Sequence, residues 1–244
     1  MAETLIVSRV LALAPTRLVY VADLHGSTTC WTKLLQLAHR LKPDCIIVGG
    51  DLLGPGVDPK LLKRWETMAN DMLSPEIPIT MSPGNYDPPD IDEVLKGCRR
   101  FIYAVGQVVI LNGRHEMVSC DYVNPSPFNT FRELAEEKLL ELLEDAISQL
   151  SSVENAVFNF HAPPYGTRLD VVGEAMHVGS RAVRTVIERY QPKLSLHGHI
   201  HESASIDKIE RTVCVNPGSQ HHRGILNYAL IELDEEVSCE LASI

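Results

Sequence analysis

The stretch Leu196-His197-Gly198-His199-Ile200-His201-Glu202, near the C-terminal end of the chain, places three histidines within five positions. It completes the apolar run Lys193–Leu196, so the histidines stand where a predicted strand ends. Alternating histidines there can aim their rings at one point, and neutral imidazole is the commonest protein ligand of borderline transition metals. Histidine clusters also occur on solvated turns, so this stretch alone leaves a metal site and an exposed turn equally open.

Four earlier segments end in the same way. Predicted strands at 18–22, 45–48, 77–81 and 156–160 are followed by side chains of types that bind metals, namely Asp23 and His25, Asp51, Asn85, and His161. In open α/β sheets, sites gather beyond the carboxyl ends of the strands. Asp and Asn are also common turn residues. Turn chemistry alone does not account for carboxylates, an amide and imidazoles after so many strands of one chain.

The order D-x-H, G-D, G-N, a lone H and G-H-x-H resembles the calcineurin-like metallophosphoesterases, and it extends from Asp23 to His201. The segments Gly84–Asp87 and Asn216–Ser219 are similar to those of the small prokaryotic-type members of that superfamily. The resemblance implies an α/β fold in which two packed mixed β-sheets are flanked by helices, a four-layer αββα sandwich. Because the sequence has no repeat and no linker, we expect a single domain over residues 1–244.

Apolar residues at helical spacing predict helices at about 28–41, 59–73, 91–98, 131–150 and 179–190. Three further segments are predicted as strands: short antiparallel pieces over 101–123, a strand at 212–215, and two edge strands over 228–241. The segment 165–177 has no clear period and is predicted to be a functional loop.

The resemblance further implies two divalent metal ions that share one bridging aspartate. The shared ligand would be Asp51, with Asp23, His25 and His201 completing one ion and Asn85, His161 and His199 completing the other. No thiolate is present in this set, which favours Mn and leaves Fe, Zn or Ni open, while an oxygen-only Mg or Ca site is disfavoured. Two such ions neutralise a phosphate ester, activate a bridging water and align the attacking and leaving oxygens.

The sequence departs from this family at Tyr86. Many members carry a histidine there, which protonates the leaving group or binds the phosphate and is oriented by the acid that follows, here Asp87. Tyrosine, with an ordinary pKa of about 10, is a poorer proton donor than imidazolium at neutral pH. We therefore take Asp51, Tyr86 and Asp87 as catalytic candidates, and keep His177 and His222 as alternative proton donors.

Four residues are predicted to contact the substrate: Asn85, His177, His222 and Arg223. His177 lies in the long loop, while His222 and Arg223 follow a Gly-Ser turn, and arginine forks match phosphate oxygens well. For the last three, an exposed surface position is the alternative. His197 is either a supporting partner of the metal ligands or a core residue.

Charge and composition limit the cellular partners. The net charge of −10 argues against broad binding to nucleic acid or anionic membranes. No apolar run reaches the roughly 20 residues that span a bilayer, and the N-terminal segment lacks a basic leader, so we expect a cytoplasmic protein with no membrane partner. The six cysteines form no C-x-x-C pair, which predicts buried thiols.

These observations predict a binuclear metal-dependent hydrolase of a small phosphorylated substrate. We expect phosphodiesters to be preferred and a metal-bridging hydroxide to be the nucleophile. A phosphomonoesterase or a nucleotide pyrophosphohydrolase is the alternative among enzymes, and a non-catalytic scaffold on the same fold is the alternative from another class. A scaffold need not keep all the ligand positions, and this chain keeps them. The sequence leaves the substrate and the oligomeric state open.

Overall fold

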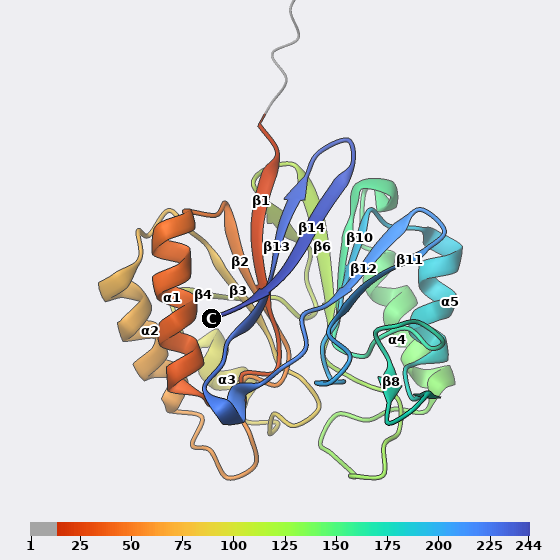
Figure 1. Ribbon diagram of the computed structural model, residues 1–244, viewed down its shortest axis with the longest axis horizontal. Coiled ribbons are helices and arrows are strands. Elements are labelled where there is room, and N and C mark those ends of the chain that lie inside the picture. The colour runs from red at the N-terminus through yellow and green to blue at the C-terminus, as the bar shows by residue number, and fades with distance from the viewer. Residues whose placement is uncertain (1–13) are drawn as a thin grey trace, which may run out of the picture.

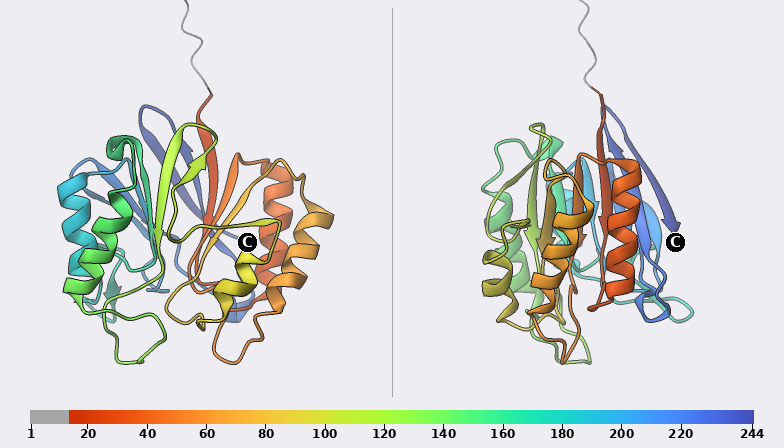
Figure 2. Two further views of the ribbon diagram at one scale, coloured as in Figure 1. Left: turned by 180° about the vertical axis from the view of Figure 1, so that it is seen from behind. Right: turned by 90° about the vertical axis from the view of Figure 1, so that its left-hand side faces the viewer.

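Two six-stranded mixed sheets pack face to face, and helices cover the outer face of each sheet (Figure 1). This computed structural model describes residues 14–244, so the N-terminal segment that we expect to carry no leader lies outside the described residues. Figure 2 shows the same layers from behind and from the side. The predicted four-layer αββα sandwich is therefore confirmed.

The first sheet has the strand order β14-β13-β1-β2-β3-β4. Its strands are β1 (Thr16–Val21), β2 (Cys45–Gly49), β3 (Ile79–Ser82), β4 (Phe101–Tyr103), β13 (Asn227–Leu233) and β14 (Val237–Ser243). Strands β1 to β4 are parallel, β13 runs antiparallel to β1, and β14 runs antiparallel to β13. Helices α1 (Thr28–Leu41), α2 (Leu61–Met72) and α3 (Ile91–Lys96) pack on its outer face.

The second sheet has the order β11-β12-β10-β7-β6-β5. Its strands are β5 (Val109–Leu111), β6 (His115–Cys120), β7 (Val157–Phe160), β10 (Leu194–Leu196), β11 (Ser205–Ile209) and β12 (Thr212–Asn216). The four inner strands are parallel, and β5 and β11 are antiparallel edges. Helices α4 (Glu136–Ile147) and α5 (Arg181–Tyr190) cover its outer face, and β8 (Val171–Val172) and β9 (Met176–His177) form a separate hairpin.

The inner strands are apolar on both faces because both faces are covered. In β1, Leu18 and Tyr20 enter the core between the sheets, while Val19 and Val21 enter the core beneath the helices. Alternate residues of a strand point to opposite faces, so a strand buried on both sides becomes a continuous apolar run. This is the pattern that made these strands predictable.

Three of the secondary-structure predictions are wrong in part. Strand β13 is not an edge strand, because β1 and β14 pair with it on either side. Strand β4 runs parallel in the first sheet, so only β5 and β6 form an antiparallel pair in the segment 101–123. Helix α4 begins at Glu136 rather than near 131, because the chain around Arg132 pairs with Val123 in an extended conformation.

The cysteines agree with the sequence prediction. Five thiols are buried, Cys239 is partly buried, and all six are free. Among residues 14–244, no helix has both the length and the apolar character needed to cross a membrane.

Candidate metal centre

The predicted ligands meet at one edge of the two sheets, where parallel strands end. Strands β1, β2 and β3 of the first sheet lead directly to Asp23 and His25, Asp51, and Asn85. Strands β7 and β10 of the second sheet lead to His161, and to His199 and His201. The carboxyl ends of parallel strands lie at a common edge, so the fold brings these seven residues to one place.

Asp23, His25, Asp51 and His201 form the first group. Each offers a ligand atom, and these atoms lie within 4.8 Å of one another. The Nε2 atoms of His25 and His201 are 3.1 Å apart, and His25 Nε2 is 3.6 Å from Asp51 Oδ2. His201 Nε2 lies 3.5 Å from Asp23 Oδ1. Two carboxylates and two imidazoles at these separations can surround one divalent cation.

Asp51 also belongs to a second group, with His161 and His199. His161 Nε2 lies 3.5 Å from Asp51 Oδ2 and 3.7 Å from Asp23 Oδ1. The side chains of Asp51 and His161 are each only 1% exposed. A buried carboxylate common to two candidate groups is the arrangement expected of a bridging ligand.

Three buried polar atoms of the candidate ligands have no hydrogen-bond partner: Asn85 Oδ1, His161 Nε2 and His199 Nδ1. The Nδ1 atom of His161 donates to the Gly49 carbonyl at 3.0 Å, so Nε2 is the nitrogen that has a lone pair when the ring is neutral. The amide of Asn85 donates to Thr130 Oγ1 at 2.9 Å, which leaves its carbonyl oxygen free. An unsatisfied buried polar atom costs about 1–3 kcal/mol. Three together fit a site built to hold cations.

The backbone is strained where these ligands are held. Asp23, His25, Asp51 and His199 have φ values of 55°, 45°, 48° and 67°, in the left-handed region. Such a conformation costs a non-glycine residue on the order of 1–3 kcal/mol and is concentrated at functional sites. The loops after β1 and β2 hold each other in place, since His25 N donates to the Asp51 carbonyl at 2.9 Å.

Glycine is required at position 50, in the loop after β2. Gly50 has a φ of 105°, and a Cβ there would lie 2.0 Å from His161 Nδ1. The absence of a side chain therefore lets the imidazole from the second sheet approach the backbone of the first sheet.

The charges of the cluster are mutually dependent. Burial acts to raise the pKa of Asp23, but His201 and the other histidines hold it well below its usual range. Burial lowers the pKa of His161, but Asp51 and Asp23 outweigh it and raise this pKa to about 9. Burial lowers the pKa of His199 to about 4. A cation bound at His161 must displace a proton, so metal affinity should rise with pH.

Backbone groups of two loops surround the carboxylate of Asp87. Its buried carboxylate accepts hydrogen bonds from the backbone N–H groups of Leu52 at 2.9 Å, Leu53 at 2.7 Å and Gly84 at 2.8 Å. Burial and then Asp51 raise its pKa to about 7, against these hydrogen bonds. Asp87 therefore fastens the loop after β3 to the loop after β2 and is engaged by backbone groups.

Tyr86 lies beside the first group. Its backbone N–H donates to Asp51 Oδ1 at 2.9 Å, and its ring stands edge-on to His25 with centroids 5.6 Å apart. Burial, followed by Asp51 and Glu133, raises the pKa of the phenol above its ordinary value. The hydroxyl therefore remains protonated at neutral pH and can donate a hydrogen bond.

A cavity of about 780 Å³ opens beside the cluster. Its lining includes Tyr86, His199 and His201, together with the exposed apolar side chains of Phe128 and Met176. An apolar wall next to a polar cluster is typical of a small-molecule site, in which a few polar groups fix the orientation of the ligand.

The predicted substrate contacts are not all at this cavity. His177 lines it and is held by Asp170 at 2.7 Å, whereas Asn85 is buried and is not part of the lining. His222 and Arg223 are exposed and are not part of the lining. Arg223 instead donates to Gln220 Oε1 at 3.1 Å.

His197 is a core residue whose ring contacts both residues that flank the candidate ligand His161. It is completely buried, and Nδ1 lies 2.8 Å from the Phe160 carbonyl and 2.9 Å from the Ala162 carbonyl. It therefore ties the end of β10 to the end of β7.

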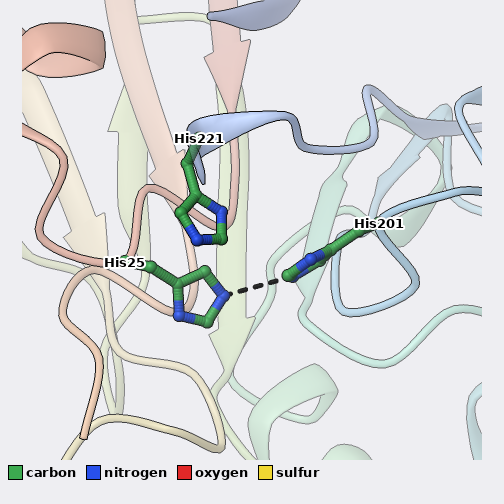
Figure 3. A group of neighbouring side chains, drawn as sticks. All are labelled: His25, His201 and His221. Atoms are coloured by element: carbon green, nitrogen blue, oxygen red, sulfur yellow. Dashed lines mark hydrogen bonds between the residues drawn. The ribbon is translucent and has the colours of Figure 1, made fainter. Parts of the chain in front are cut away.

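Sequence reasoning did not place His221, which also follows the Gly-Ser turn, among the metal ligands, yet Figure 3 shows it beside His25 and His201. His221 begins the short 3-10 helix His221–Arg223 after β12, and these three histidines form a third group of possible ligands. The signal was the position after Asn216–Ser219, but no local pattern distinguishes His221 from the histidine that follows it.

The supporting side chains of the 130–133 segment were also missed. Thr130 Oγ1, which accepts from Asn85, donates to Glu133 Oε1 at 2.6 Å. Burial opposes ionisation of Glu133, but hydrogen bonds from Ser126 and Thr130 lower its pKa to about 2. Arg132 is buried, pairs with Asp121 and donates to the Asp87 carbonyl at 3.3 Å. These contacts fix the loop that carries Asn85.

Comparison with known proteins identifies the family. The model of the calcineurin-like phosphoesterase family matches residues 16–203. The chain belongs to the calcineurin-like phosphoesterase family. The uncharacterized protein MJ1162 of Methanocaldococcus jannaschii is 30% identical to this calcineurin-like phosphoesterase over 212 residues, which are 84% of this chain and 89% of that protein.

Two solved structures share the fold of this calcineurin-like phosphoesterase. TT1561 of Thermus thermophilus matches with a TM-score of 0.71 and 15% identity, covering 93% of this chain and 98% of that one. A dimetal phosphatase from Danio rerio matches with a TM-score of 0.60 and 14% identity, covering 94% and 99%. At these identities the likeness is one of fold.

Proposed function

We propose that this calcineurin-like phosphoesterase hydrolyses phosphate esters with two divalent metal ions, that Mn is the favoured metal, and that phosphodiesters are preferred. The observation that carries the proposal is the pair of ligand groups that meet at buried Asp51, with three unpartnered polar atoms among the candidate ligands. A scaffold has no need of strained, buried, unpartnered groups in this number.

The proposed roles follow the two groups. Asp51 is shared, Asp23, His25 and His201 complete one ion, and Asn85, His161 and His199 complete the other. When bound, two such ions supply positive charge that neutralises a phosphate ester and makes a water acidic enough to be a nucleophile at neutral pH.

The remaining residues orient the site and the substrate. Asp87 and Arg132 hold the loop that carries Asn85 and Tyr86. The ring of Tyr86 stands beside His25 of the first group and its phenol stays protonated at neutral pH, so we assign it a hydrogen bond to a phosphate or leaving-group oxygen. His177 is held by Asp170 and lines the cavity, so we assign its ring a contact with the substrate.

The cavity supports the preference for diesters. Its apolar wall around Phe128 and Met176 offers a place for an organic substituent of the phosphate, which a diester carries on both sides. A phosphomonoesterase is the second candidate, because the Danio rerio protein of similar fold is named a dimetal phosphatase. The cytoplasmic location remains a prediction from the sequence.

Metal analysis and a substrate screen test the proposal. Protein expressed with Mn should contain two ions per chain, and it should hydrolyse bis-nitrophenyl phosphate faster than nitrophenyl phosphate. If the protein binds no metal even after reconstitution, the proposed metal-dependent activity is refuted and a non-catalytic scaffold is favoured. If nitrophenyl phosphate is hydrolysed faster than the diester, the protein is a phosphomonoesterase, the second candidate.

A further inference from the structure

The ring of His221 packs against two histidines of the first group of candidate ligands. Its ring centroid is 4.5 Å from that of His25 and 5.6 Å from that of His201. The three rings come from the loops after β1, β10 and β12, and Figure 3 shows them facing a common space. Their possible ligand atoms all lie within 4.8 Å of one another.

The hydrogen bonds of Ser219 determine which nitrogen of His221 is free. Ser219 Oγ donates its single proton to the Asp23 carbonyl at 2.7 Å. The contact of 3.1 Å between Ser219 Oγ and His221 Nδ1 must therefore have Nδ1 as the donor. Because Nδ1 carries the proton of the neutral ring, Nε2 carries a lone pair.

This is the arrangement found at His161, where a backbone carbonyl accepts from Nδ1 and leaves Nε2 as the acceptor atom. A hydrogen bond that fixes the ring and its tautomer is the usual support of a metal-bound histidine. A lone pair cannot donate to a phosphate oxygen, so in this tautomer His221 is suited to a cation and not to the phosphate.

We propose that Nε2 of His221 is an additional ligand of the ion that Asp23, His25, Asp51 and His201 hold. This inference rests on the proposed function, because it requires that ion to be bound. It makes the ligand set of the first ion larger than that of the second, and it gives Ser219 the role of positioning residue.

Metal titration of tag-free, metal-depleted protein tests the assignment. Wild type, His221→Ala and the matched control His222→Ala are titrated with Mn²⁺, and free Mn²⁺ is followed by electron paramagnetic resonance. His222 is the adjacent, exposed histidine outside the third group. We expect His221→Ala to lose at least about tenfold in affinity for one ion and to keep the other, while His222→Ala titrates like wild type.

Two further measurements separate ligation from a structural role. Co²⁺ bound to wild type and to His222→Ala should give the same visible absorption spectrum, and His221→Ala should give a different one. Melting temperatures without metal should be similar for all three proteins, whereas the rise on adding Mn²⁺ should be smaller for His221→Ala. If the alanine variant does not fold, His221→Gln replaces it in the same titration.

The outcomes distinguish the two proposals. If wild type binds two ions and the folded His221 variant binds both with unchanged affinity and spectrum, His221 is not a ligand, but the proposed function stands. If wild type binds no metal, the proposed function fails and this inference fails with it. Weakened inorganic phosphate binding with unchanged metal affinity would assign His221 to the substrate and overturn its role as a ligand.

Discussion

The two sheets contribute different chemistry to the candidate metal centre. The loops of the first sheet supply both carboxylates, the amide and one imidazole, namely Asp23, Asp51, Asn85 and His25. The loops of the second sheet supply imidazoles only: His161, His199, His201 and, by our inference, His221. All the negative charge of the cluster therefore comes from one side of the molecule.

Backbone strain is distributed in the same way. Three of the four first-sheet residues have left-handed backbones, whereas His199 is the one such residue among the four of the second sheet. The strained loops are held by each other and by the Asp87 carboxylate. The first sheet thus supplies charge on a rigid, strained frame, and the second supplies donors that are neutral when they bind metal. Substitutions on the two sides should therefore have unequal effects.

The largest difference is expected between Asp51→Asn and His161→Ala. Asp51 belongs to both groups and carries charge, so its amide variant should disturb both ions. His161→Ala should weaken only the second ion. We expect kcat/KM of Asp51→Asn to fall by more than the roughly 10–100-fold that is typical when a supporting contact of a metal site is lost. We also expect this fall to be larger than that of His161→Ala. Steady-state kinetics with bound-metal analysis checks this.

Folding must be controlled, because Asp51 also accepts from the backbone of Tyr86. Circular dichroism and thermal melting of each variant provide that control. A folded Asp51→Asn protein with two metals and wild-type turnover would show that the carboxylate is not shared.

The seven candidate ligands could be predicted from the sequence because each closely follows the end of its strand. The strand fixes the position of the next few residues, so D-x-H or G-H-x-H places side chains without knowledge of distant contacts. This local rule also explains the success with the fold, since strands covered on both faces form apolar runs.

The supporting contacts could not be predicted, because they join distant segments. Thr130 meets Asn85 across 45 positions of sequence, and no local pattern indicates that pairing. The choice between His221 and His222 depends on the backbone of the preceding turn, in which Gly218 has a φ of 66°. The contacts of Asp87 were not predicted either, because its carboxylate accepts from backbone N–H groups that no sequence motif displays.

The variant Tyr86→His tests which group of the first-sheet loops protonates the leaving group. Without a histidine at position 86, wild type should depend on good leaving groups, so kcat/KM should fall steeply from nitrophenyl to alkyl diesters. An imidazolium donor should flatten that fall, since general acid catalysis contributes about 10²–10⁴-fold. We expect the lower end of this range, because Asp87 is occupied by three backbone N–H groups and is not free to orient the new ring.

The test is a leaving-group series on both proteins at one pH with saturating Mn. Tyr86→Phe is the matched control, because it keeps the ring beside His25 and removes the hydroxyl. Equal slopes for wild type and the histidine variant would mean that the proton comes from another group, with His177 the next candidate at the cavity.

The smallest effect is expected at Thr130, which supports the amide of the first sheet without touching a metal. Its Oγ1 accepts a hydrogen bond from Asn85 Nδ2, and the buried amide oxygen is left without a hydrogen-bond partner. Thr130→Val keeps the shape and removes this acceptor. We expect about a tenfold loss of affinity for the second ion, within the range typical of such supporting contacts. The affinity for the first ion should not change.

Ser126→Ala is the matched control for Thr130→Val. Ser126 donates to the same Glu133 carboxylate, at 2.6 Å, but no hydrogen bond joins it to Asn85. Mn²⁺ titration of both variants should therefore show a weaker second ion only in Thr130→Val. Equal losses would mean that Glu133 acts by holding the loop as a whole. If neither variant changes the titration, the orientation of the Asn85 amide does not limit metal binding, and the second ion depends on its imidazoles and on Asp51.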